Sequence, residues 1–226
     1  MLTVITGKIR IGKTSFMTAK AIERARNTAK RLEMRRAVSE LKRKGFNVST
    51  ADYALYANYR IKFDDHRGAT FESERIEPKR LFIGDNATFI RPFSVLAISE
   101  AQTYFNARHF QTFTAEQARF FQTSGHFGVD ILLDTQDIDT LDKTLRGLCE
   151  IYEIKSRTIY DNRGRVTERA EPRDVSRIVF KYSYRNDVNA RAQHGTYIID
   201  YNVFECYNSY ECYNDYLPAD KKGIII

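Results

Sequence analysis

A short segment near the N-terminus has the residue types and the spacing of a phosphate-binding loop. Two glycines stand five residues apart and a lysine and a threonine follow the second, in the order Gly7, Lys8, Ile9, Arg10, Ile11, Gly12, Lys13 and Thr14, with Ser15 next. In this pattern backbone N–H groups surround a phosphate, and the glycines permit the dihedral angles and the close approach that this requires. We therefore predict that these nine residues bind the phosphates of a nucleotide.

Two side chains of this loop can act on the phosphates and on a metal ion. The Lys13 ammonium would neutralise β- and γ-phosphate oxygens, and the Thr14 hydroxyl would ligate Mg²⁺. A helix that begins at Lys13 would direct its positive end at the same phosphates. The alternative is a glycine turn that leads into a helix without a ligand. Arg10 and Ile11 are bulkier than the small residues that many such loops have at these positions.

A second group of polar side chains follows an apolar run at residues 93–98. A P-loop enzyme needs an acidic residue at the tip of a buried strand, to hold the metal ion and to activate water. Glu100 has this position and would polarise the attacking water, whereas Ser99 stands where the metal-binding Asp usually does. The Ser99 hydroxyl could bind a metal-bound water but supplies no charge. The alternative is a strand that ends in a polar turn.

Gln136 and several arginines complete the set of candidate residues. Gln136 ends the apolar run at residues 128–136, so its side chain could contact the γ-phosphate or orient water. Three arginines could reach the nucleotide of a neighbouring subunit and stabilise the charge of the transition state there: Arg108, Arg119 and Arg146. Each of them could equally be an ordinary surface or salt-bridge residue.

Strand-like and helix-like patterns alternate along the first 150 residues. This alternation predicts an α/β fold, a P-loop NTPase whose mainly parallel sheet is flanked by helices. Apolar or β-branched runs predict strands at residues 2–6, 54–63, 93–98 and 128–136. Three- and four-residue spacing predicts helices at residues 13–45, 114–123 and 138–148. The first of these is one long helix or two, and Asn27 and Thr28 are its weakest point.

The pattern changes after Glu150. Residues 151–160 and 176–184 predict antiparallel strands around a polar turn at residues 161–164. Residues 197–216 contain six tyrosines, which we interpret as core packing, with stacking on a partner as the alternative. We therefore predict a P-loop ATPase core at residues 1–150. A small antiparallel, tyrosine-rich extension at residues 151–226 would pack on it.

Charge and composition narrow the classes of protein. The net charge is +7, and residues 1–50 hold thirteen Lys and Arg against three Glu, which leaves the rest of the chain at −3 by difference. This basic region is a solvated helix face or, because it follows a nucleotide motif, a surface for nucleic acid or an anionic membrane. The cysteines (Cys149, Cys206 and Cys212) form no CxxC pair, which indicates reduced thiols in a cytoplasm. No apolar run reaches the roughly 18 residues of a membrane span.

The order of these motifs resembles that of the zonular occludens toxin-like (Zot-like) family. Its members are the assembly ATPases of filamentous phages, within the FtsK–HerA group of DNA-pumping ATPases. The resemblance spans nearly the whole chain, and the phosphate loop is the segment that is specific by itself. The matching segments are residues 2–14, 95–102, 105–108, 128–136, the helix that contains Arg146, and residues 203–209.

The resemblance implies a motor that extrudes phage DNA through the host envelope. The family implies ATP and Mg²⁺ as cofactors, a homo-oligomeric ring such as a hexamer, and no small-molecule substrate other than ATP. Its partners would be single-stranded DNA or a phage DNA–protein complex, together with assembly proteins of the inner membrane. The protein would lie in the host cytoplasm, at the cytoplasmic face of that membrane. Arg108 or Arg146 would act between subunits.

Two features depart from the family pattern. Ser99 replaces the usual Asp, which would weaken the metal site and slow turnover. Family members also commonly have a membrane span after the ATPase domain, whereas this sequence ends at Ile226 without one. Either a span would follow in the parent protein, or a partner would anchor this member.

Three other functions remain open. The first is an FtsK–HerA-like motor that packages or translocates DNA. The second is a nucleotide-binding scaffold that changes shape but hydrolyses poorly, because Ser99 is uncharged. The third is a small-molecule kinase, which is disfavoured because no second phosphate-binding motif is evident. The response of hydrolysis to single-stranded DNA distinguishes a motor from the other two.

Overall fold

The computed structural model describes residues 1–45, 55–64, 69–81, 90–107, 113–168, 171, 173–184, 192–200 and 202–207. Most of the strands form one sheet, in the order β11-β10-β8-β1-β7-β6-β2-β5, with β9 paired to β8; β3 and β4 form a separate pair. The strands are β1 (Leu2–Thr6), β2 (Leu55–Ala57), β3 (Lys62–Asp64), β4 (Thr70–Glu72), β5 (Glu74–Arg75), β6 (Val95–Ile98), β7 (Asp130–Thr135), β8 (Glu150–Tyr160), β9 (Val166–Thr167), β10 (Val175–Tyr184) and β11 (Gln193–Asp200).

The central strands run parallel, as predicted. β8, β1, β7, β6, β2 and β5 pair in parallel with their neighbours, and β10, β11 and β9 extend the sheet in antiparallel fashion. The fold is therefore α/β, as predicted, with a mainly parallel sheet flanked by helices and an antiparallel C-terminal portion. Because parallel strands share a direction, the residues that follow β1, β6 and β7 meet at one edge of the sheet.

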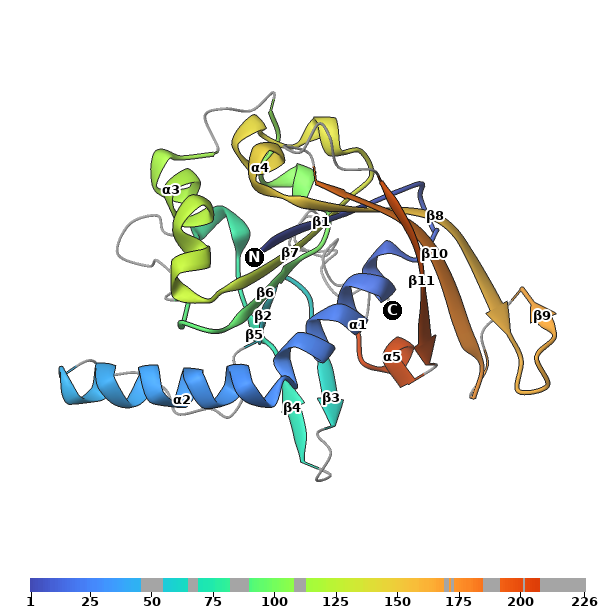
Figure 1. The fold of residues 1–226 in the computed structure, drawn as a ribbon, viewed down its shortest axis with the longest axis horizontal. Coiled ribbons are helices and arrows are strands. Elements are labelled where there is room, and N and C mark those ends of the chain that lie inside the picture. The colour runs from blue at the N-terminus through green and yellow to red at the C-terminus, as the bar shows by residue number, and fades with distance from the viewer. Residues whose placement is uncertain are drawn as a thin grey trace, which may run out of the picture.

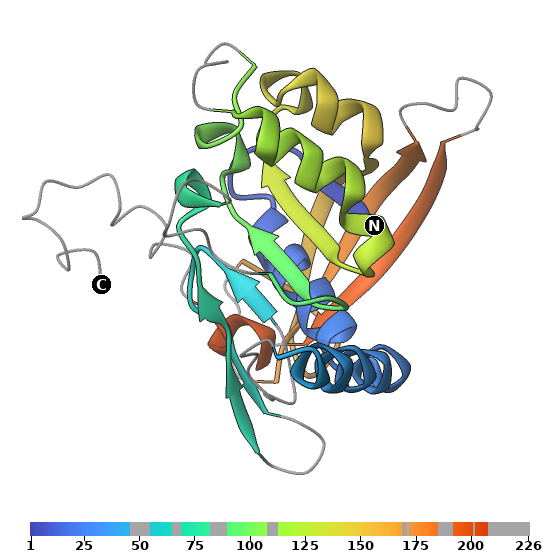
Figure 2. The ribbon, with the colours of Figure 1, turned by 90° about the vertical axis from the view of Figure 1, so that its left-hand side faces the viewer.

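Helices cover both faces of the sheet (Figures 1 and 2). They are α1 (Lys13–Ala25), α2 (Thr28–Arg43), α3 (Ala115–Thr123), α4 (Lys143–Leu148) and α5 (Asn202–Glu205). Side chains alternate along each strand, so each face has its own core. Val4 of β1 packs in a cluster with residues of α2, α3 and α4, whereas the next residue, Ile5, packs with residues of α1. None of the helices in the described residues is long and apolar enough to cross a membrane.

The long N-terminal helical region is two helices. α1 ends at Ala25, and Asn27, which the sequence marks as a weak point, lies between the helices. α2 continues outward from the end of α1 and extends beyond the edge of the sheet, at the lower left of Figure 1. It still contributes Met34 and Val38 to the core, where they are 3% and 6% exposed.

Two predicted elements differ from the structure. The single strand expected at residues 54–63 is two short strands, because β2 pairs in the main sheet while β3 pairs with β4, and Asn58 between them bonds to another strand end. The helix expected at residues 138–148 is a 3₁₀ turn (Ile138–Thr140) followed by α4. Leu141 interrupts it in an extended conformation that buries its side chain completely, and the Asp142 carboxylate caps α4.

The C-terminal portion is joined to the core through β8. This strand is antiparallel to β10, as predicted, and its first residues also pair in parallel with β1. The sheet is therefore continuous across residue 150, and a division into two domains there stays a prediction. Tyr197 packs edge-on against Phe16 of α1, in agreement with core packing, and Tyr207 packs against Tyr59. Cys149 and Cys206 are free thiols, whereas Cys212 and the tyrosines after Tyr207 lie outside the described residues.

The aromatic cluster under α3 supplies a test of this core. Phe105 is fully buried, and its ring centroid lies 5.2 Å from that of Phe121 and 5.8 Å from that of Phe113. We expect Phe105→Ala to lower the free energy of unfolding by about 3–5 kcal/mol, because it leaves a cavity. Phe127→Ala is the matched control, since Phe127 is 54% exposed and should change stability by about 0.5 kcal/mol or less. Urea denaturation measures both, and equal losses would contradict the assigned core.

Candidate functional site

The candidate residues meet at the carboxyl edge of three adjacent strands. β7 lies between β1 and β6, with Ile5 beside Asp134 and Ile98 beside Leu133. The phosphate loop follows β1, Gln136 follows β7, and Ser99 follows β6. The fold thus brings the three predicted polar segments to one edge, although more than 120 residues separate the first from the last.

The phosphate loop curls around the ammonium group of Lys13. Lys13 Nζ donates to the carbonyl oxygens of Gly7 at 3.0 Å and Lys8 at 2.9 Å, and the residue is only 7% exposed. Ser15 donates its hydroxyl to the carbonyl oxygen of Gly12 at 3.0 Å. Lys8, Ile9 and Arg10 are exposed. The loop therefore has a cation at its centre and an open outer side, as anion binding requires.

The glycines of the loop are needed for both conformation and space. Gly7 and Gly12 have φ angles of 149° and 92°, which residues with a side chain rarely adopt. A Cβ at Gly7 would lie 2.9 Å from the carbonyl oxygen of Ile154 in β8, and one at Gly12 would lie 3.0 Å from Cδ of Arg157. Arg10 also has a positive φ, 62°, although it is not a glycine, so the loop backbone is strained at this residue.

A carboxylate that the sequence analysis did not select lies at the centre of the site. Asp134 of β7 is fully buried, and its Oδ2 accepts a hydrogen bond from the Thr14 hydroxyl at 2.9 Å. The Ser99 hydroxyl donates to both oxygens, at 3.2 and 3.1 Å, and the Glu100 N–H donates to Oδ1 at 2.7 Å. Asp134 thus connects the start of α1 with the end of β6.

Alternation along the strands explains this contact. Asp134 lies two residues after Leu132, which packs in the core on the α1 side, and Ser99 lies two residues after Ala97 of the same cluster. Both side chains therefore point toward α1 and Thr14. The signal available in the sequence was an ionisable residue inside the apolar run 128–136, a position where charge is rarely buried unless it is paired or functional.

Burial also changes the acidity of this carboxyl group. Removal from water raises the pKa of Asp134 to about 6, and the negative charge of Glu100 adds to the rise, while the hydrogen bonds from the Glu100 N–H, Thr14 and Ser99 oppose it. Thr14, Ser99 and Asp134 together form a set of oxygen donors of the kind that Mg²⁺ prefers. The donor set at this edge therefore fits a divalent cation.

The end of β6 is held by a buried amide. Asn58 accepts from the Ser99 N–H at 2.8 Å and donates to the Ser99 carbonyl oxygen at 2.9 Å, and it is fully buried. The next residue, Glu100, has φ 53° and ψ 46°, a left-handed conformation that a non-glycine residue rarely adopts. Its carboxylate is half-buried and accepts a hydrogen bond from the Gln102 side chain. Strain at such a position is typical of functional sites.

The remaining predicted residues lie farther from the centre. Gln136 is exposed, and its carbonyl oxygen accepts from the Thr6 hydroxyl at 3.2 Å. Arg146 of α4 pairs with Asp139 of its own chain at 2.9 Å. Arg119 is on α3, which covers the opposite face of the sheet from α1. Arg108 lies outside the described residues.

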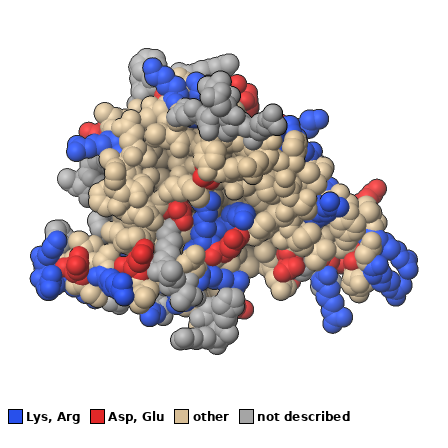
Figure 3. All heavy atoms as spheres, in the orientation of Figure 1, with Lys and Arg blue, Asp and Glu red and all other residues tan. Residues whose placement is uncertain are grey.

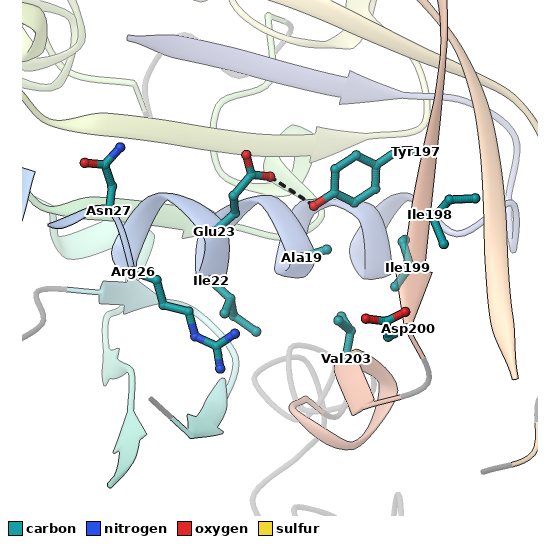
Figure 4. A pocket seen from close by; sticks show the side chains of 10 residues that line it. All are labelled: Ala19, Ile22, Glu23, Arg26, Asn27, Tyr197, Ile198, Ile199, Asp200 and Val203. Atoms are coloured by element: carbon teal, nitrogen blue, oxygen red, sulfur yellow. Dashed lines mark hydrogen bonds between the residues drawn. The ribbon is translucent and has the colours of Figure 1, made fainter. Parts of the chain in front are cut away.

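A groove of about 420 Å³ lies beside α1 but away from the loop. α1 and β11 line it, and Tyr197 donates to Glu23 at 3.0 Å there (Figure 4). Its lining begins at Ala19, beyond the first turn of α1, and includes no residue of the phosphate loop. The groove is therefore separate from the candidate site.

Comparisons with known proteins identify a family and two similar solved structures. The family model described as "Zonular occludens toxin (Zot)" matches residues 1–181. The chain is similar to the N-terminal domain of zonular occludens toxin from Neisseria meningitidis, with a TM-score of 0.51 and 19% identity over 92% of this chain and 98% of that one. It is also similar to the genome packaging NTPase B204 from Sulfolobus turreted icosahedral virus 2 in complex with ATP-gammaS, with a TM-score of 0.44 and 12% identity over 85% and 95% of the two chains. No curated protein sequence matches.

The amide that holds the end of β6 supplies a test of the site's architecture. We expect Asn58→Ala to lower the free energy of unfolding by about 2–4 kcal/mol, because it leaves the buried N–H and carbonyl of Ser99 without partners. Asn202→Ala is the control, since Asn202 is exposed, and it should cost about 0.5 kcal/mol or less. Chemical denaturation measures the difference. Similar small effects of both variants would mean that Asn58 does not support the site.

Proposed function

Because this chain belongs to the zonular occludens toxin family, we propose that it is an ATP-binding and ATP-hydrolysing motor for the assembly and extrusion of filamentous phage. The observation that supports this most is the arrangement around the phosphate loop. Lys13 is held at the centre of the loop, and the Thr14 hydroxyl contacts a buried carboxylate at 2.9 Å. These are the two side chains that P-loop enzymes use for the phosphates and for the metal ion.

The loop residues Gly7–Ser15 bind the triphosphate in this proposal. Backbone N–H groups of the exposed outer side of the loop surround the β-phosphate. On binding, Lys13 exchanges its two carbonyl partners for β- and γ-phosphate oxygens, which neutralise its charge. The N-terminal end of α1 points at the same phosphates. Thr14 and Ser99 would hold Mg²⁺, which would supply positive charge to the phosphate oxygens.

Hydrolysis uses groups at the ends of β6 and β7. A water oxygen forms a bond to the γ-phosphorus, and the bond from that phosphorus to the bridging oxygen of the β-phosphate breaks. Glu100, half-buried just after β6, orients this water and accepts its proton. Gln136, exposed at the end of β7, contacts the γ-phosphate. Lys13 stabilises the charge on the leaving oxygen.

A ring of subunits completes the site. Arg108 or Arg146 of one subunit reaches the nucleotide of the next and stabilises the transition state. For Arg146 this requires that its pairing with Asp139 be exchanged for a phosphate oxygen. The ring works at the cytoplasmic face of the host inner membrane, with phage or host assembly proteins as partners. Its cargo is single-stranded DNA or a phage DNA–protein complex.

α2 is the surface that we assign to the DNA. One side of this helix is buried through Met34 and Val38, while basic side chains of the other side are exposed (Figure 3). The exposed basic residues are Arg35, Arg36, Lys42 and Arg43 of α2 and Lys44 directly after it, against exposed Glu33 and Glu40. Such a basic surface attracts the phosphate backbone of a nucleic acid without reading its sequence.

The role of the loop lysine is tested by substitution. We expect Lys13→Ala to weaken binding of ATPγS at least about 100-fold and to abolish hydrolysis, since the phosphates lose their main cationic partner. Lys20→Ala, on the same helix, is the control, because Lys20 pairs with Glu23 at the surface and should leave binding unchanged. Isothermal titration calorimetry and phosphate release measure the two effects. Normal hydrolysis by the Lys13 variant would refute the mechanism.

The role of α2 is tested by charge reversal. We expect the triple variant Arg36→Glu, Lys42→Glu and Arg43→Glu to weaken binding of single-stranded DNA at least about 10-fold at low salt and to reduce the salt dependence of the affinity. The control reverses the exposed Arg163, Arg165 and Arg177, which lie on the β8–β10 side of the molecule. Fluorescence anisotropy at several salt concentrations measures both. Equal losses of affinity in the two triple variants would indicate that net charge, and not α2, attracts the DNA.

A separate measurement distinguishes a motor from a scaffold. Hydrolysis by the wild type that single-stranded DNA does not stimulate would favour a nucleotide-binding scaffold.

A further inference from the structure

The proposed function requires an acidic ligand for the divalent cation, and position 99, where this acid is expected, has none. A divalent cation on a nucleotide is held by hard oxygen ligands, in P-loop enzymes the loop Ser or Thr and an acidic residue at a strand end. Here the strand that should supply the acid, β6, is followed by Ser99, whose hydroxyl is neutral. Glu100 is the next acid, but its backbone is left-handed and its carboxylate bonds to Gln102.

The neighbouring strand has a carboxylate at the same level of the sheet. Ile98 of β6 is in register with Leu133 of β7, so Ser99 and Asp134 follow as neighbours on the α1 side. Asp134 Oδ2 is the acceptor for the Thr14 hydroxyl at 2.9 Å. It therefore contacts the one loop side chain that the metal ion also requires.

We infer that Asp134 is the acidic residue that holds the divalent cation of the bound nucleotide, in place of the carboxylate that position 99 lacks. This inference rests on the proposed function. Asp134 and Thr14 face the cation together, directly or through its water ligands. Ser99 is a positioning residue, because its hydroxyl donates to both Asp134 oxygens and holds the carboxylate toward the loop.

The partners of Asp134 support a cation as the missing counter-charge. The carboxylate is fully buried, and its donors are two hydroxyl groups and one backbone N–H, all of them neutral. Within the described residues, no Lys or Arg side chain pairs with it. A buried carboxylate without an opposite charge is unfavourable. This carboxylate lies next to the phosphate loop, which would bind a nucleotide together with its divalent cation.

Ser99 is also the residue that this arrangement requires. The Ser99 Oγ lies 3.1–3.2 Å from the two Asp134 oxygens. A second carboxylate at position 99 would place two negative charges at about that separation in a buried site, and one of them would be forced to take up a proton. The acid can therefore stand at one of the two strand ends but not at both. In this chain it stands on β7.

Calorimetric titration with ATPγS, in Mg²⁺ and in EDTA, tests the inference without relying on turnover. The wild type should bind more tightly in Mg²⁺ than in EDTA. We expect Asp134→Asn to lose at least about nine-tenths of this enhancement while its affinity in EDTA stays within about threefold of the wild type. Asp130→Asn is the matched control at the other end of β7, where Asp130 pairs with the N-terminal ammonium, and it should keep the full enhancement.

An exchange of the two residues protects the test against a simple loss of structure. The double variant Ser99→Asp with Asp134→Ser returns a single carboxylate to the end of β6 and should regain most of the Mg²⁺ enhancement. Mn²⁺ with ATPγS, followed by electron paramagnetic resonance, should report one bound ion in the wild type and in the exchanged variant but not in Asp134→Asn.

The outcomes separate the inference from the proposed function. If Asp134→Asn keeps the wild-type enhancement while Lys13→Ala loses nucleotide binding, the inference is overturned and the proposed function stands. If Asp134→Asn does not fold, the exchanged variant decides, and absence of the enhancement in it overturns the inference. If the wild type binds no ATPγS in either condition, both fail.

Discussion

The carboxylate of Asp134 ties together the parts of the site that come from different regions of the chain. Its three hydrogen-bond donors are a hydroxyl in the first turn of α1, the side chain at the end of β6 and the backbone N–H of the following residue. In a buried site each of these donors would be costly to leave without a partner. The loop and the two strand ends therefore keep one relative position, so the site is organised before any ligand arrives.

The strand order is the constraint that makes this possible. β7 lies between β1 and β6, so a side chain at its end can reach both of its neighbours. The two faces of the sheet then have different tasks. One face packs against α3 and α4 through a large aromatic and aliphatic cluster, and the other faces α1 and receives the polar side chains at its carboxyl end. Both faces thus have apolar cores, and the polar site is confined to the carboxyl end of the face that packs on α1.

Much of the fold could be predicted from local patterns. The loop, β1 and the break near Asn27 are as expected, and α3 begins with the capping box of Thr114 and Gln117. The family resemblance based on the order of motifs is confirmed. Asp134 was missed because its role depends on which strands are neighbours, and a sequence of apolar runs does not contain their order. Leu141 shows the same limit, since helical spacing predicted a continuous helix while burial of one side chain interrupts it. The roles of Glu100, Gln136 and the arginines stay predictions.

β8 has a mechanical consequence for the loop. Its eleven residues, about 36 Å of extended strand, pair with β1 at one end and with the antiparallel strand β10 along nearly the whole length. Gly7 lies so close to the backbone carbonyl of Ile154 that an added methyl group would clash with it, and the side chain of Arg157 lies beside Gly12. The loop backbone at Gly7 thus packs directly on β8, and β8 continues into the antiparallel strands of the C-terminal portion. A movement of the loop at Gly7 toward the sheet would therefore press on the backbone of β8, the strand that joins the nucleotide edge to the C-terminal strands.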